Sequence, residues 1–143
     1  MTIRPYGAWQ FTHPDFDTQE AAPGLVLTHA GRIALVDGLA SVRQSLLLLL
    51  STVPGERVMR PDYGCNLHLL VFSPNDETTH GLAIHCVREA VSRWEPRAEI
   101  VDMDATRSAE APERIALQLH YRLRQTLQND VLDMSFDLQP PSR

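Results

Sequence analysis

Two short combinations of cysteine and histidine in this 143-residue sequence could contribute to a zinc site, but their spacing is poor. Cys65 and His68 have the two-residue gap of a zinc half-site, and His85 and Cys86 are neighbours in a segment with a helical pattern. Zinc takes four well-placed ligands, whereas adjacent residues on a helix point about 100° apart. Cys86 also adjoins an apolar stripe, where cysteine usually serves as a small core residue. The sequence therefore predicts neither a metal ion nor another cofactor.

Motifs for covalent catalysis and for phosphate binding are missing from the sequence. It has no Gly-x-Ser-x-Gly elbow, and neither cysteine lies in a catalytic motif. The glycine-containing segment 55–64 has the wrong length for a phosphate-binding loop and lacks the lysine. The sequence therefore does not support a nucleophilic enzyme or a nucleotide-binding protein.

Paired carboxylates are the remaining candidates for catalysis, because a glycoside hydrolase uses two carboxyl groups about 5–10 Å apart. Glu56, Asp62 and Glu95 lie in predicted loops or at the ends of predicted elements. An arginine stands within two residues of each acid: Arg57, Arg60 and Arg97. A guanidinium lowers the pKa of a carboxyl group, whereas a general acid needs a raised pKa. Structural ion pairs are therefore predicted, and no catalytic residue is assigned.

The composition is that of a globular protein of one main domain. The chain is 43% hydrophobic and 22% charged, and its net charge of −5 argues against binding nucleic acid or an anionic membrane. Its longest aliphatic run, Leu46–Leu50, is far shorter than the roughly 20 residues of a membrane span. The N-terminus shows no apolar signal segment, and two cysteines do not make a disulfide framework. A cytoplasmic location is expected.

Two regions are predicted, an extended N-terminal arm over residues 1–24 and a domain over residues 25–143. Prolines and glycines in the arm oppose regular structure. The arm also has four aromatic residues that a solvated tail would not need: Tyr6, Trp9, Phe11 and Phe16. We therefore expect the arm to lie either on this domain or on a partner.

The first half of the domain predicts a hairpin and a helix. Leu25–Thr28 and Ile33–Val36 have the composition of two short strands around a turn. Asp37 is placed to cap a helix that ends before Val53–Gly55. Its apolar stripe has helical spacing: Leu39, Val42, Leu46 and Leu49.

A second helix of about 18 residues is predicted to follow a short helical turn at residues 67–72. Asn75 or Asp76 can cap this helix, and Pro96 ends it. One apolar stripe repeats along it: Ile84, Val87, Val91 and Trp94, with Ala83 and Ala90 beside them.

Three strands are predicted in the remainder of the chain. Apolar and polar residues alternate over 101–105, 115–124 and 132–138, which gives each strand one buried and one wet face. Val101, Met103 and Ala105 are assigned to the buried face of the first strand. The wet face of the second strand is basic and that of the third is acidic, so antiparallel pairing would align opposite charges. The predicted fold is α+β, with two main helices on one side of an antiparallel sheet.

Three segments match a known family in their order along the chain. They are residues 55–64, which we call the loop motif, then Leu70–Phe72 and Trp94–Arg97. The motif residues of the loop are Gly55, Glu56, Arg57, Pro61, Asp62, Tyr63 and Gly64. With the alternating strands that follow, these segments closely resemble the sheath-initiator family of contractile injection systems. That family includes the small baseplate wedge protein of contractile-tailed phages and its relatives in type VI secretion and extracellular phage-tail-like particles. The resemblance covers about residues 33–138 and leaves out the arm.

The resemblance implies a structural baseplate protein, although family members have often been labelled lysozymes. It implies that Glu95, Pro96 and Arg97 dock onto the helical core bundle of the baseplate wedge. It also implies that the C-terminal strands, 114–124 and 131–138, accept strands from the first sheath ring. On the residues alone, Glu95 and Arg97 could instead serve this domain's own fold by pairing with Arg57 or Glu56.

The last strand is predicted to have an open edge. It contains neither lysine nor proline, which commonly protect an edge from further pairing. A partner strand could therefore add to it through main-chain hydrogen bonds. The residues assigned to this role are Val131, Leu132, Asp133, Met134, Ser135, Phe136, Asp137 and Leu138. The alternative is that the N-terminal arm covers this edge within the same molecule.

The leading hypothesis is an adaptor that joins the baseplate wedge to the sheath and nucleates sheath assembly, in six copies by family resemblance. Its expected partners are the sheath protein and wedge proteins, with spike, hub or inner-tube proteins as further candidates. One alternative is a muramidase-like hydrolase that uses Glu56 or Glu95, and another is a generic adaptor of a multi-protein machine. The sequence leaves open whether the parent machine is a phage, a secretion system or a free particle.

Overall fold

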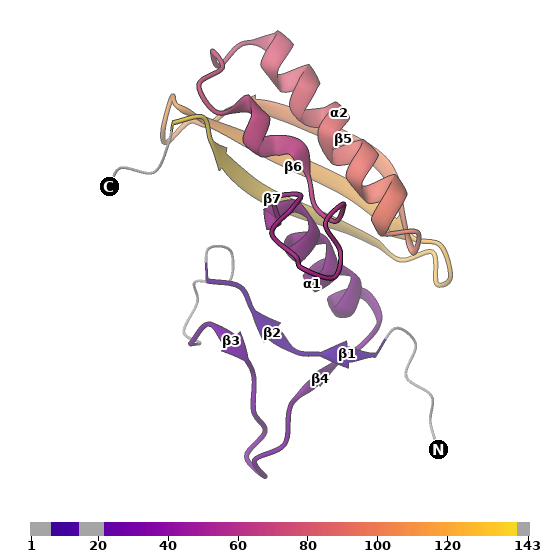
Figure 1. Ribbon diagram of the computed structural model, residues 1–143. Helices are drawn as coiled ribbons and strands as arrows, with labels where there is room; N and C mark the ends of the chain where they lie inside the picture. Colours follow the sequence, from indigo (N-terminus) through magenta and orange to yellow (C-terminus); the bar gives the residue numbers. More distant parts are fainter. Residues whose placement is uncertain (1–6, 15–21, 140–143) are drawn as a thin grey trace. The chain divides into compact units, whose positions relative to one another are not determined.

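The computed structural model describes residues 7–14 and 22–139 (Figure 1). The chain divides into two compact units, Met1–Leu48 and Leu49–Arg143. Tyr6 and Phe16 of the predicted arm lie outside the described residues. Among the residues that are described, no helix combines the length and the apolar character needed to cross a membrane.

The first unit contains four short strands that pair two by two. β1 (Ala8–Trp9) pairs antiparallel with β4 (Leu35–Val36), and β2 (Phe11–Thr12) pairs antiparallel with β3 (Gly24–Leu25). The described part of the arm therefore lies on this chain. The predicted hairpin is present, but its paired region is shorter than expected. Its two sides form a β-bridge between Leu27 and Ile33, and each side also forms main-chain hydrogen bonds with the arm.

The first long helix, α1 (Gly38–Ser51), begins directly after Asp37 as predicted. The carbonyl of Asp37 accepts a hydrogen bond from the Ser41 N–H at 3.3 Å. The side chain of Gln44 holds the arm, since its Nε2 donates to the Trp9 carbonyl at 2.8 Å and its Oε1 accepts from the Phe11 N–H at 2.8 Å. The boundary between the two units falls inside this helix, before Leu49.

The second unit is a three-stranded antiparallel sheet with helices on one face (Figure 1). The strand order is β5 (Ala98–Arg107), β6 (Arg114–Leu123) and β7 (Asn129–Asp137), in agreement with the three predicted strands of an antiparallel sheet. η1 (Asn66–Leu70) and α2 (Glu77–Trp94) contact each other, and α2 contacts β5. The α+β prediction is confirmed.

The core of the second unit follows the predicted periods. Every second residue of β6 is buried: Ile115, Leu117, Leu119, Tyr121 and Leu123. Leu132, Met134 and Leu138 continue the buried face in and beyond β7. α2 contributes the small or branched side chains of Ala83, Val87, Ala90 and Val91. A period of two in the strands and 3.6 in the helix places all of these side chains on inward faces.

Val101 is a correction to the predicted pattern, because its side chain is 60% exposed. The pairing of β5 with β6 shifts register between Ile100 and Asp102, which marks a β-bulge. A bulge inserts one unpaired residue and interrupts the alternation of faces. Met103 and Ala105 lie beyond the bulge and are buried as predicted.

The charges on the wet face pair across strands, but not only between β6 and β7. Arg114 lies 3.5 Å from Asp137, and Gln118 donates to Asp133 at 2.8 Å, both across the predicted pair of strands. Arg122, by contrast, forms its 2.6 Å ion pair with Glu99 of β5. The central strand has a neighbour on each side, so its basic residues divide between them.

Asp76 is the N-cap of α2, and its carboxylate accepts a hydrogen bond from the Thr79 N–H at 2.9 Å. Asn75, the other predicted cap, instead donates to the carbonyls of Pro112 and Arg114. The hydrogen bonds from Thr79 lower the pKa of Asp76 below its ordinary value of 3.8.

Asp76→Ala should lower the thermal midpoint by a few degrees near pH 7, because an N–H group at the start of α2 loses its acceptor. A carboxyl whose pKa is lowered by folding stabilises the protein above its unfolded pKa, and this contribution disappears as the pH falls through the folded pKa. Thermal melts of both proteins should therefore converge below pH 3.8. A constant difference down to pH 2 would show that the charged cap is not the cause.

Candidate functional site

The loop motif forms a compact structure held by main-chain hydrogen bonds. The Gly55 N–H donates to the Pro61 carbonyl at 2.7 Å, which closes the base of the loop. The Glu56 carboxylate accepts from the Val53 N–H at 3.1 Å, so this acid serves the loop itself. At the tip, the Arg60 N–H donates to the Arg57 carbonyl at 3.2 Å and forms a turn.

Two aromatic rings and two arginines hold this loop against the end of α2. The rings of Tyr63 and Trp94 meet edge to face, with centroids 5.4 Å apart. Arg57 lies over the Tyr63 ring at 4.2 Å, and Arg93 lies over the Trp94 ring at 4.9 Å. We call these four residues the aromatic cluster. Burial is the largest influence on the Tyr63 hydroxyl and raises its pKa.

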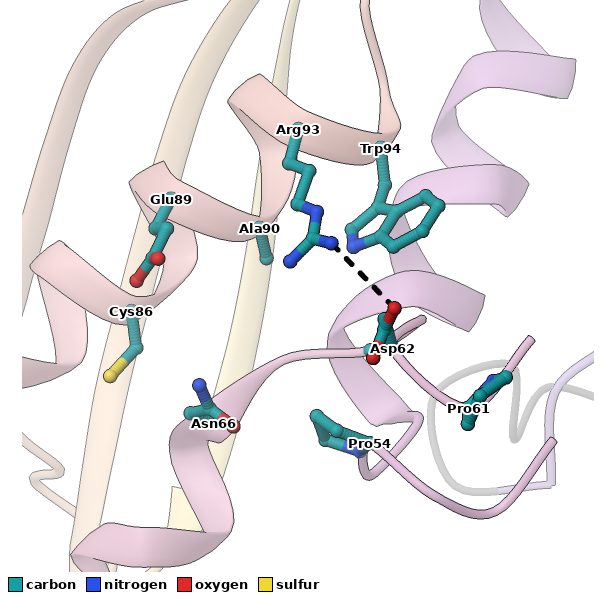
Figure 2. A pocket seen from close by; sticks show the side chains of 10 residues that line it. Pro54, Pro61, Asp62, Asn66, Cys86, Glu89, Ala90, Arg93 and Trp94 are labelled. Carbon is teal, nitrogen blue, oxygen red and sulfur yellow. Dashed lines mark ion pairs between the residues drawn. The ribbon is translucent and has the colours of Figure 1, made fainter.

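Figure 2 shows the pocket beside this cluster, with Pro54, Pro61 and Asp62 on one side and residues of α2 on the other. Arg93 and Asp62 face each other across it at 3.9 Å. The ion pair predicted for Asp62 is present, but its partner is Arg93 and not Arg60, the arginine near it in sequence. The pocket holds about 190 Å³, which is less than the roughly 300 Å³ at which small-molecule sites begin.

Glu95 is buried at the end of α2, with a side chain only 3% exposed. Both of its carboxylate oxygens accept hydrogen bonds from Arg97, at 2.6 and 2.8 Å. This two-pronged pair confirms the predicted ion pair and excludes Arg57 as the main partner of Glu95, because Arg57 lies on Tyr63. Arg97 remains 29% exposed, and Pro96 is exposed beside it.

A second pocket, of about 510 Å³, contains Glu95 and Glu99 and is therefore the place where paired carboxylates could act. Arg122 binds Glu99 at 2.6 Å and lowers its pKa. Arg97 donates one hydrogen bond to each carboxylate oxygen of Glu95. A general acid must keep its proton near neutral pH, which requires the opposite electrostatic environment.

The cysteines and histidines do not gather into a site in the described part of the chain. No group of three or more His, Cys, Asp or Glu side chains is placed there to hold a metal ion. Cys65 is buried, and burial raises the pKa of its thiol to about 11. Cys86, predicted to be a core residue, is only partly buried.

Among the described residues, β7 is the last strand of its sheet and pairs with β6. The Leu138 N–H donates to the Glu113 carbonyl and the Leu123 N–H to the Gln128 carbonyl, at 3.0 and 2.9 Å. Both bonds lie in the register that pairs Arg114 with Asp137. Hydrogen-bonded and non-hydrogen-bonded pairs alternate along antiparallel strands. Even-numbered residues of β7 therefore bond to β6, and odd-numbered residues direct their N–H and C=O groups away from it.

Three exposed residues of β7, Asp133, Ser135 and Asp137, thus present main-chain groups at the outer edge. Leu132, Met134 and Phe136 turn their main chain toward β6 and contribute side chains to the inner face. Leu138 follows the end of the strand, and its carbonyl accepts from the Phe72 N–H at 2.7 Å. The main-chain groups that point away from β6 therefore belong to residues within β7. Leu138, after the end of the strand, uses both its N–H and its carbonyl in main-chain hydrogen bonds.

Sequence reasoning missed the contribution of Trp94 and Arg93 to the loop. Trp94 stands in the segment that matches the family, but the local pattern places it only on the apolar stripe of α2. Its contact with Tyr63, 31 positions earlier, depends on the tertiary structure. The sequence patterns likewise indicated no functional role for Val58 and Met59, which are exposed in the loop motif.

A family model described as baseplate wedge protein gp25 matches residues 36–128. The fold is similar to a Geobacter sulfurreducens protein provisionally called a tail lysozyme, at 38% identity and a TM-score of 0.68, over 76% of this chain and 100% of that one. A search of the curated proteins found no match.

Two assembled baseplates contain chains of similar fold. A chain of the anti-feeding prophage baseplate matches with 21% identity and a TM-score of 0.57, over 82% of each chain. A chain of the post-contraction pyocin R2 baseplate matches with 23% identity and a TM-score of 0.50, over 79% of this chain and 97% of that one.

Proposed function

The chain belongs to the baseplate wedge protein gp25 family of contractile injection systems, and from this premise we propose that it joins the wedge to the sheath and nucleates sheath assembly. The proposed partners are sheath and wedge proteins, with spike, hub or inner-tube proteins as further neighbours. Six copies would serve one baseplate. The role is structural.

The outer edge of β7 is the observation that supports this proposal most directly. The N–H and C=O groups of Asp133, Ser135 and Asp137 point away from β6, and their side chains are exposed. A strand of a sheath subunit added there would gain main-chain hydrogen bonds without displacing the core. The inward side chains would stay in place, since Leu132 is 1% exposed and packed inside the unit.

The wedge contact is proposed for the surface that Pro96 and Arg97 form after α2. Glu95 is buried and orients the Arg97 guanidinium with two hydrogen bonds. The partly exposed Arg97 can then meet a carbonyl or carboxylate of the wedge, while Glu95 acts as a positioning residue.

A muramidase-like activity receives no support from the site chemistry. Glu56 accepts a main-chain hydrogen bond inside the loop, and Glu95 is held by Arg97. We therefore do not propose a lysozyme activity for this chain, although family members and the Geobacter sulfurreducens protein have been called lysozymes.

Ser135→Pro should give a folded protein whose baseplates bear no sheath. Ser135 directs its N–H outward, so proline removes no bond to β6 and yet blocks an added strand, as prolines on natural edge strands do. We expect sheathed particles to fall at least tenfold in electron micrographs, with this chain still present in the baseplates. Deleting β7 would be a poor test because it removes core residues.

Ser135→Thr is the matched control, since it keeps the N–H and the hydroxyl and introduces a β-branched side chain suited to a strand. It should assemble normal sheaths. Normal sheaths on Ser135→Pro baseplates would refute strand addition at this edge.

A further inference from the structure

We propose that Val58 and Met59, at the tip of the loop motif, insert into an apolar pocket with an acidic rim on a neighbouring baseplate protein. The tip is distinct from the β7 edge and from Glu95, Pro96 and Arg97. The inference rests on the chain's place in a baseplate, but it does not depend on strand addition.

The exposure of the two tip residues is the first support. Val58 is 93% exposed and Met59 is 89% exposed, more than any other large apolar side chain in the described residues. A valine and a methionine with so little internal contact contribute almost nothing to the fold. Adjacent exposed apolar side chains at one protruding site are typical of a contact surface.

The rigidity of the loop is the second support. Main-chain bonds close both its base, from Gly55 to Pro61, and its tip turn, from Arg60 to Arg57. The side chain of Arg57 is held over Tyr63, which in turn packs on Trp94. A pre-organised tip loses little conformational entropy when it binds, so its apolar contacts are used more fully for affinity.

The charges beside the tip indicate the chemistry of its partner. Arg57 and Arg60 flank the two apolar residues in a chain whose net charge is −5. Arg60 is exposed, and no ion pair is found for it among the described residues. Two guanidinium groups around an apolar centre fit a pocket that has carboxylates at its rim, as in interfaces with a dry core and a charged border.

The test uses particles assembled from the complete parent gene cluster, with either the native chain or a Val58→Ser/Met59→Ser variant. Quantitative mass spectrometry of purified baseplates should show at least a tenfold loss of the variant chain. The thermal midpoint of the free variant should remain within about 2 °C of the native value, because exposed side chains contribute little to folding. Leu82→Gln is the matched control, since it removes another exposed apolar side chain, on α2, and should be incorporated normally.

Two further measurements identify the partner. A photoreactive amino acid at position 59 should cross-link to a baseplate protein at a segment that contains both apolar and acidic residues. Arg60→Glu should reduce incorporation, and Arg60→Lys should largely preserve it. Normal incorporation of the double variant, or a cross-link only to sheath or tube subunits, would overturn the proposal. The Ser135→Pro experiment tests strand addition independently. If strand addition is wrong, Ser135→Pro baseplates will contain this chain and will still bear sheaths.

Discussion

Arg97→Ala should lower the free energy of unfolding by about 3 kcal/mol, because it removes a cation and two hydrogen bonds from the buried carboxylate of Glu95. The Glu95 side chain is 3% exposed, and both of its oxygens are bonded to Arg97 at 2.6 and 2.8 Å. The partial exposure of Arg97 places the expected loss at the lower end of the range for buried pairs. Urea unfolding followed by circular dichroism measures this loss directly.

The control is Arg122→Ala, which removes the cation from an exposed pair in which Nε and Nη2 of Arg122 both donate to one oxygen of Glu99. Arg122 and Glu99 are 40% and 41% exposed, so water can solvate the remaining carboxylate, and the loss should be much smaller than that of Arg97→Ala. A second variant, Glu95→Gln/Arg97→Ala, removes the buried charge with its partner and should recover at least half of the loss. Equal stabilities of Arg97→Ala and Arg122→Ala would contradict the assignment of Glu95 as a buried, dependent charge.

A test of the wedge contact at Arg97 must allow for the loss of stability in Arg97→Ala. Arg97→Ala alone cannot separate a lost wedge contact from a weakened fold. Incorporation into baseplates should therefore be compared between Arg97→Ala and Glu95→Gln/Arg97→Ala. If Arg97 contacts the wedge, both proteins should fail to be incorporated, although the double variant is the more stable.

Gly64→Ala should destabilise the second unit by about 4 kcal/mol or more, since two independent penalties act at one residue. Gly64 has a φ of +138°, which side chains rarely adopt, and a Cβ atom there would lie 2.5 Å from the Thr52 carbonyl oxygen and 2.9 Å from the Pro54 nitrogen. Both obstacles are main-chain atoms that cannot rotate away. Chemical denaturation of the purified protein should show the loss.

Gly55→Ala separates strain from collision. Gly55 also has a positive φ, +100°, but a Cβ atom there would meet nothing within 4 Å. We expect a cost of about 1–2 kcal/mol from backbone strain alone. A Gly64→Ala variant that is no less stable than Gly55→Ala would show that the loop base can open without penalty, which would also weaken the argument for a rigid tip.

The parts of this protein that depend on local periodicity and on local caps can be predicted from its amino-acid sequence. Alternation in β6 identified five buried residues without error, because a strand directs successive side chains to opposite faces. The length of α2, about 18 residues, and a cap at Asn75 or Asp76 followed from helical spacing and from the acceptor that free N–H groups need, and the structure shows that Asp76 is the cap. The motif segments likewise indicated the family that the model match over residues 36–128 supports.

Which groups from distant parts of the chain meet depends on the three-dimensional fold. The bulge at Val101 arises from pairing with β6, and the pairing of Asp62 with Arg93 from the packing of a loop on α2. Glu95 is buried because the chain around it closes over the carboxylate, which its neighbours in sequence do not specify. The outward direction of the Ser135 N–H depends on the register of two strands, where a shift of one residue would turn it inward. These features depend on contacts between residues far apart in the chain, which local sequence patterns do not specify.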